Sequence, residues 1–224
     1  MIDFAKDRVK SILLAYVLIF IPMWTIYFMN HGVLNNMFLN ILGVHPRTFE
    51  FMEFFGIMGS WMVHDNNNAG HILNNSIGLI GLLFFVGLFE KRIVSLLTVL
   101  IATSGISTWV LGAPNSVHIG ASGLLFALFG YILSSAFLGK RWIYLIPIVG
   151  AVAYYGLSYY GSFLNGLKLQ DGVSFAAHFG GLLSGCLTGW LYNKEEEKTS
   201  YKRSKSIKEK WNDFVWSLKY KFKK

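Results

Sequence analysis

Six apolar segments, each close to the length of a membrane-crossing helix, constrain the fold of this 224-residue chain most strongly. A transmembrane helix needs about 20 consecutive, mainly apolar residues. Only 14% of the residues are charged, whereas about 25% are charged in a typical soluble domain. We therefore predict an all-α membrane protein in which residues 1–192 form one six-transmembrane-helix domain. Its spans are expected at about residues 11–29, 71–89, 93–111, 120–138, 142–160 and 174–192.

The distribution of basic residues predicts the orientation of these spans. With six spans, 18 of the 20 lysine and arginine residues fall on the side of the two termini, and only Arg47 and Lys168 fall on the other side. Positively charged loops tend to remain in the cytoplasm. We therefore expect a multi-pass protein of the cell membrane, plasma or inner, with both termini in the cytoplasm. Since this orientation explains the net charge of +8, we predict no nucleic-acid partner.

Two segments outside the six spans carry patterns typical of membrane contact. The first loop, residues 30–70, contains the apolar stretch 54–63, which is too short to span a bilayer and indicates a membrane-surface or re-entrant element. The tail, residues 193–224, has 11 basic and 5 acidic residues. Four of its apolar residues have the spacing of one helix face: Trp211, Phe214, Val215 and Leu218. The tail is either an interfacial helix on the anionic inner leaflet or a solvated basic tail.

Polar side chains inside the spans are few, and such residues are candidates for a functional site because they are costly in lipid. They lie near the starts of even-numbered spans: His71 and Asn75 in the second, Ser122 in the fourth and His178 in the sixth. Even-numbered spans all run from the outside to the inside, so their starts share one depth in the outer part of the bilayer. We therefore expect these side chains to converge in a site that opens to the outer side.

These residue types together permit acyl transfer. A neutral histidine can accept the proton of a serine hydroxyl, and hydrogen-bond donors can stabilise the oxyanion that forms. Gly120 and Gly123 leave room for a substrate carbonyl beside Ser122. Within the predicted spans no carboxylate is available to orient His178, so the serine and the histidine would act as a dyad.

Simpler interpretations exist for each of these residues taken singly. A serine in a membrane helix commonly bonds its own backbone, small residues suit helix packing, and a lone histidine can be a structural hydrogen-bonding group. Metal chemistry is disfavoured, because the sequence has no H-E-x-x-H pattern or similar pair with a carboxylate base. We therefore expect neither a metal nor a cofactor. The joint pattern favours the hydrolytic site over the separate interpretations.

Four motifs carry a family resemblance: GASG (120–123) opens the fourth span, HILNN (71–75) lies on the second, AHFGGLLSG (177–185) lies on the sixth, and GVHPR (43–47) lies in the first loop. The chain resembles the rhomboid family of intramembrane serine proteases in all six spans and in the first loop. The resemblance implies a rhomboid-like bundle with a long membrane-associated first loop. It also implies an endopeptidase that acts on transmembrane protein substrates within the lipid bilayer, for which nothing in the sequence requires an oligomer.

The resemblance also implies a role for each candidate residue. Ser122 would be the nucleophile and His178 its general base. His71 and Asn75, together with the backbone N–H of Ser122, would stabilise the oxyanion. Tight packing of the sixth span on the fourth, which brings His178 to Ser122, would depend on two small residues of the sixth span, Gly181 and Gly185.

Two positions depart from the common family pattern. Many members have a histidine five residues before that of the H-x-x-x-N motif, whereas His64 is seven residues before His71, so the role of His64 stays open. Phe126 occupies the position where many members have a tyrosine that stacks on the catalytic histidine.

Two alternative functions are a non-catalytic rhomboid-like protein that binds membrane clients and an unrelated transporter. Client-binding rhomboid-like proteins typically lack the serine or the histidine, whereas this chain has both. A transporter predicts a paired intramembrane carboxylate or inverted repeats, and the sequence shows neither.

Overall fold

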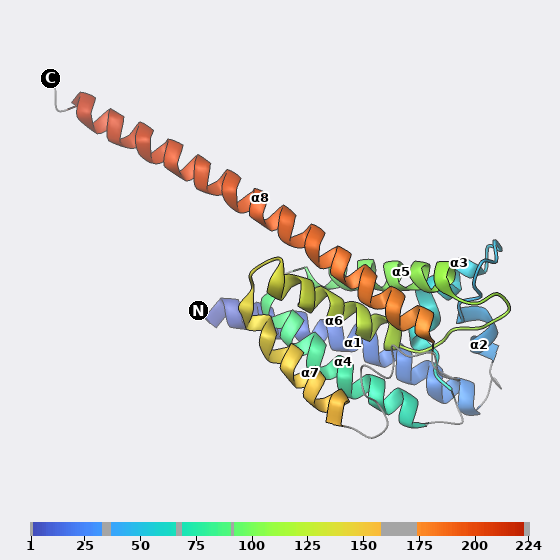
Figure 1. The fold of residues 1–224 in the computed structure, drawn as a ribbon. Coiled ribbons are helices and arrows are strands. Elements are labelled where there is room, and N and C mark those ends of the chain that lie inside the picture. The colour runs from blue at the N-terminus through green and yellow to red at the C-terminus, as the bar shows by residue number, and fades with distance from the viewer. Residues whose placement is uncertain (1, 33–36, 66–68, 91, 158–173, 222–224) are drawn as a thin grey trace.

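The computed structural model describes residues 2–32, 37–65, 69–90, 92–157 and 174–221, which form a helical bundle (Figure 1). Its long helices are α1 (Ile2–Gly32), α4 (Ala69–Phe89), α5 (Ile93–Leu111), α6 (Ser122–Phe137), α7 (Leu145–Leu157) and α8 (Phe175–Lys221). The shorter elements are α2 (Met37–Leu42), α3 (Glu53–Gly59) and the 3₁₀ helices η1 (Ser60–Met62) and η2 (Trp142–Tyr144). The described residues contain no strand beyond an isolated bridge between Val44 and His118. The predicted all-α fold class is confirmed.

The helices differ in how far they meet the requirements of a membrane span. Among the described residues, three helices are long and apolar enough to cross a membrane: Lys6–His31, Ala69–Phe89 and Ile93–Leu111. Two further apolar helices, Ser122–Phe137 and Trp142–Ala153, are shorter. The end of the predicted span 142–160 lies outside the described residues, since α7 is described as far as Leu157.

The sixth predicted span and the basic tail form one continuous helix, α8, of 47 residues. Residues 193–221 contain no glycine or proline and are rich in lysine and glutamate, which are good helix formers. An exposed ion pair between Lys198 and Glu195 (3.1 Å) lies along this part of the helix. Figure 1 shows α8 extending well beyond the bundle. The boundary predicted after residue 192 therefore marks a change from apolar to basic residues within one helix.

The core of the bundle is built around α6. All residues from Gly123 to Ile132 are buried, and α6 contacts α4, α5, α7 and α8. Large apolar side chains on the outer helices, such as Val17 of α1, Phe84 of α4 and Val149 of α7, are instead exposed. An apolar surface around a packed interior is the arrangement of a helical bundle surrounded by lipid.

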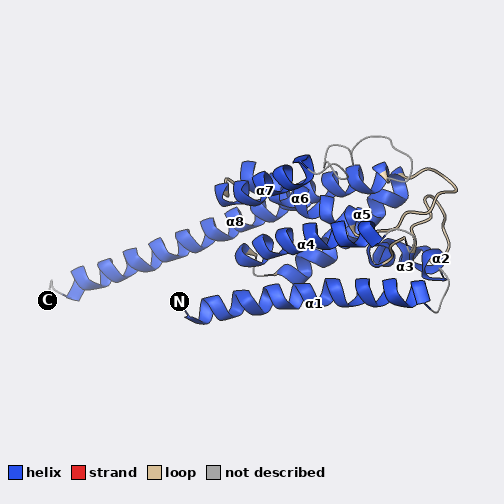
Figure 2. Cartoon of the chain, turned by 90° about the horizontal axis from the view of Figure 1, so that it is seen from below, coloured by secondary structure: helices blue, strands red, loops and turns tan. Residues whose placement is uncertain are grey.

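Figures 1 and 2 show both termini at one end of the bundle and the first loop, with α2 and α3, at the opposite end. The helices α4, α6 and α8 begin at the end that holds the first loop. Because His71, Ser122 and His178 lie in the first turns of these helices, they share that end of the bundle.

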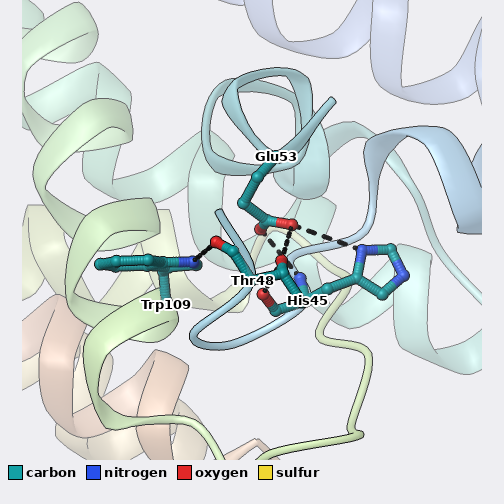
Figure 3. Close-up of polar contacts among 4 residues, drawn as sticks. All are labelled: His45, Thr48, Glu53 and Trp109. Atoms are coloured by element: carbon teal, nitrogen blue, oxygen red, sulfur yellow. Dashed lines mark hydrogen bonds and ion pairs between the residues drawn. The ribbon is translucent and has the colours of Figure 1, made fainter. Parts of the chain in front are cut away.

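A buried carboxylate orders the first loop against α5 (Figure 3). Glu53, at the start of α3, accepts hydrogen bonds from the backbone N–H of His45 and from the Thr48 hydroxyl, both at 2.9 Å. The Thr48 carbonyl in turn accepts a hydrogen bond from the Trp109 indole of α5 at 2.9 Å. The turn between His45 and Thr48 is thereby fixed, and the neighbouring Phe49 remains exposed with its ring edge-on to Trp109.

A second buried carboxylate lies at the opposite end, where α4 ends. Glu90 accepts hydrogen bonds from the Arg141 guanidinium and, at 3.0 Å, from the Tyr144 hydroxyl. Arg141 immediately precedes η2, and Tyr144 is the last residue of η2, directly before α7. This ion pair therefore joins the ends of α4 and α7 that lie on the side of the chain termini.

Candidate active site

The loop before α6 has a backbone conformation that places Ser122 at the start of the helix. Gly120 has φ +107°, a conformation that side chains disfavour, and the helix begins two residues later with Ser122. The Gly120 N–H donates to the Ser60 carbonyl (2.9 Å), which holds this loop against η1. Ala121, at the N-cap position, has no polar side chain to bond the first N–H groups of the helix. The first N–H groups of a helix lack partners within the helix, so they are suited to bind a developing negative charge.

His71 and Asn75 lie against this loop from one face of α4. A Cβ atom at Gly120 would lie 2.8 Å from His71 Cε1, 2.9 Å from His71 Nε2 and 3.8 Å from Asn75 Nδ2. Any residue larger than glycine would displace the His71 ring. The structure thus brings His71 and Asn75 to the loop that immediately precedes Ser122.

His178 is held on α6 by Phe126. The two rings stack with centroids 4.3 Å apart and an interplanar angle of 12°, and both side chains are buried. Phe126 is four residues after Ser122, so the two lie on one face of α6. The departure from tyrosine at this position thus preserves ring stacking, and His178 packs on the helix face that carries Ser122.

Glycines allow α6 and α8 to approach at the level of these residues. A Cβ atom at Gly123 would lie 3.6 Å from Ala177, the residue before His178. A methyl group at Gly181 would overlap the Gly123 carbonyl oxygen, and one at Gly185 would overlap the Ala127 carbonyl oxygen. The two backbones are therefore in direct contact, which suits the small-residue spacing of α8.

His64 is a site residue whose role the sequence left open. Its side chain is 1% exposed, and its Nε2 accepts hydrogen bonds from Asn75 Nδ2 (3.0 Å) and from the Ala121 backbone N–H (3.3 Å). Burial, with the neighbouring His71, lowers the pKa of His64 to about 3, so the ring stays neutral and Nε2 keeps its lone pair. His64 thus joins the helix of Asn75 to the loop of Ser122.

A comparison with known protein families matches the part of the chain that holds these residues. The family model of the Rhomboid domain matches residues 52–195, which include the four candidate site residues His71, Asn75, Ser122 and His178. The chain belongs to the rhomboid family.

Similar sequences are found in mycobacteria. Uncharacterized proteins of Mycobacterium tuberculosis and Mycobacterium bovis are each 29% identical over 171 residues, which cover 71% of this chain and 67% of theirs. An uncharacterized protein of Mycobacterium leprae is 29% identical over 143 residues, 59% of this chain and 54% of its own length. These relatives add no function, and the family assignment rests on the Rhomboid domain match.

A small cavity lies beside the Ser122 loop of this rhomboid domain. Its volume is about 20 Å³, enough for one water molecule. Its lining residues include Gly120, Gly123 and four residues of polar type: Ser60, Ser104, Thr108 and His118. Apolar residues such as Ile57, Ile101 and Leu124 complete the lining, so the cavity is mixed in character. Among the described residues, no three His, Cys, Asp or Glu side chains gather as a possible metal-binding set.

Proposed function

We propose that this protein is an intramembrane serine endopeptidase that hydrolyses peptide bonds in or near transmembrane segments of other membrane proteins. The observation that carries the proposal is the stacking of His178 on Phe126, one helical turn from Ser122. A buried imidazole packed on the helix face that carries a serine supports the proposal that the two act as a catalytic dyad.

In this reaction the Ser122 hydroxyl attacks the scissile carbonyl, and His178 accepts its proton. The oxyanion that forms receives hydrogen bonds from His71, Asn75 and the Ser122 backbone N–H. Collapse of this tetrahedral intermediate breaks the C–N bond, and His178 returns its proton to the leaving amine. A water molecule then attacks the acyl-enzyme, His178 accepts a proton from it, and the same proton returns to Ser122 as the carboxylic acid leaves.

The substrate class follows from the depth of the site. The active site opens to the outer side of the membrane, so cleavage takes place near the outer ends of transmembrane segments. A substrate helix must unwind locally before its carbonyl is accessible, so small or helix-breaking residues are expected near the cut. The partners are transmembrane protein substrates and the lipid bilayer, and a monomer suffices for the chemistry.

The orientation of the chain is part of this proposal. Both termini lie in the cytoplasm, as the charge distribution indicates. The basic end of α8 then projects from the inner side, with Ile207 and Trp211 exposed on it. These apolar side chains among lysines suit contact with the anionic inner leaflet, and a solvated tail is the alternative.

The test is cleavage of a model transmembrane substrate in proteoliposomes. Wild type is expected to cleave it, whereas Ser122→Ala and His178→Ala abolish cleavage. Phe137→Ala, on an exposed position of α6 at the other end of the bundle, is a control that keeps activity. Cleavage that survives Ser122→Ala refutes the proposal. Wild type that binds the substrate segment without cleaving it supports instead the alternative of a non-catalytic client-binding rhomboid-like protein.

A further inference from the structure

His118 lies four residues before Ser122 and connects three parts of the chain. Its backbone forms an antiparallel bridge with Val44 of the first loop, with both N–H···O distances at 2.9 Å. Its side chain reaches in two directions: Nδ1 lies 2.6 Å from Ser174 Oγ, and Nε2 lies 2.8 Å from Ser116 Oγ. The half-buried ring is therefore fixed at the backbone and at both nitrogens.

The direction of each hydrogen bond follows from the neighbouring groups. Ser116 donates its one hydroxyl hydrogen to the Ala113 carbonyl (2.6 Å), so Ser116 Oγ must accept a hydrogen from His118 Nε2. The opposite nitrogen, Nδ1, then has a lone pair and accepts the hydroxyl hydrogen of Ser174. Burial lowers the pKa of His118, which favours this neutral form.

Ser174 is the residue before α8 and caps that helix. Its Oγ accepts a hydrogen bond from the Ala177 N–H (3.1 Å), and its carbonyl accepts one from the N–H of His178 itself (3.0 Å). A serine in this position satisfies helix N–H groups that would otherwise lack partners. The conformation of Ser174 therefore determines where the first turn of α8, and with it the His178 ring, begins.

From these contacts we propose that His118 is a positioning residue for catalysis: it joins the loop that carries Ser122 to the cap of the helix that carries His178. The hydrogen bonds run from Ala177 through Ser174 and His118 to Ser116 and keep the two elements in register. His118 touches neither substrate nor the reacting atoms in this role. The inference rests on the proposed protease function, because it assigns the residue that aligns that dyad.

The experiment compares wild type with His118→Ala and Ser174→Ala in the proteoliposome cleavage assay. Each variant is expected to lower kcat by about 10- to 100-fold, the effect of displacing a reacting group by up to an ångström. KM for the transmembrane substrate should stay within about threefold, because substrate binding does not use this contact. The double variant should be no more than about threefold slower than the slower single variant, since both changes break one connection.

Conservative variants separate positioning from general loss of structure. Ser174→Thr keeps the hydroxyl and is expected to retain kcat within about threefold of wild type, while His118→Asn, which keeps an acceptor close to the place of Nδ1, should recover part of the loss. His31→Ala, at the end of α1 and outside these contacts, is the matched histidine control. Thermal unfolding in detergent identifies any variant that fails to fold. If a His118 variant fails to fold, the comparison of Ser174→Ala with Ser174→Thr tests the positioning role.

The possible failures are distinguishable. If wild type shows no Ser122-dependent cleavage, the protease proposal itself fails. If wild type is active but His118→Ala and Ser174→Ala keep kcat within about threefold, the positioning role is refuted while the protease proposal stands. Additive losses in the double variant, or losses confined to KM, also refute the positioning role.

Discussion

The contact between α6 and α8 leads to the sharpest structural prediction, which concerns Gly181→Ala. A methyl group at Gly181 would overlap the Gly123 carbonyl oxygen, so the two helices must separate by about an ångström to restore an ordinary contact. Overpacking of this kind costs roughly 1–3 kcal/mol. Replacing glycine by alanine within a helix gains about 0.5–1 kcal/mol. The net expectation is a loss of up to about 2.5 kcal/mol of unfolding free energy.

The catalytic effect of Gly181→Ala should exceed its effect on stability. Gly123 is next to Ser122, and α8 carries His178 three residues before Gly181, so separation at this level moves the dyad apart. A misplacement of about 1 Å can lower a rate by roughly 100-fold. The assay measures kcat in proteoliposomes together with thermal unfolding in detergent.

The matched control is Gly81→Ala on α4, where a Cβ atom would lie more than 4 Å from every atom of the described residues that surround it. This change is expected to keep kcat within about twofold and to stabilise the protein slightly through helix propensity. The reasoning is refuted if Gly181→Ala also keeps kcat and the unfolding temperature of wild type. Equal losses in both variants would likewise refute it, because they would point to glycine replacement in general.

Three further predictions concern single side chains. The unfolded chain binds a proton on His64 near pH 6.5, whereas the folded chain binds it near pH 3. The unfolding free energy should therefore fall as the pH is lowered from about 6.5 toward 3. Thermal unfolding measured from pH 7 to pH 4 should show a smaller fall for His64→Gln than for wild type. Phe126→Tyr should keep kcat within about threefold of wild type, because the ring still stacks on His178. Phe126→Ala should lower kcat at least tenfold. Equal activity of the two variants would contradict a role for stacking. Glu90→Ala should reduce the unfolding free energy by about 3–5 kcal/mol, because it leaves the partly buried Arg141 without its carboxylate partner. Unfolding of Arg141→Ala and of the double variant measures the coupling energy between the two side chains.

Much of the fold could be predicted from the sequence because it depends on local properties. The length and hydropathy of each apolar segment predict its helix, and α5 has the predicted bounds 93–111. The tail was harder to delimit, because a change from apolar to basic residues after residue 192 does not end a helix that lacks glycine and proline. Hydropathy likewise does not resolve the short elements of the first loop.

The candidate site was predictable where motifs mark it and obscure where contacts join distant loops. Glycine and polar residues at span starts indicated Ser122 and His178. His64 was ambiguous because its spacing to His71 is unusual, and its function as an acceptor for Asn75 and Ala121 depends on the tertiary structure. The contact of His118 with Ser174 joins residues 56 positions apart, which no local pattern encodes.

Covalent labelling of Ser122 tests the central claim most directly. A serine-directed fluorophosphonate is incubated with the membrane-reconstituted protein, and the modified residue is located by peptide mass spectrometry. The account predicts a single adduct on Ser122 whose formation slows at least 100-fold in His178→Ala, since removal of the base leaves the hydroxyl a weak nucleophile. Absence of the adduct in wild type, or equal labelling of wild type and His178→Ala, would contradict it.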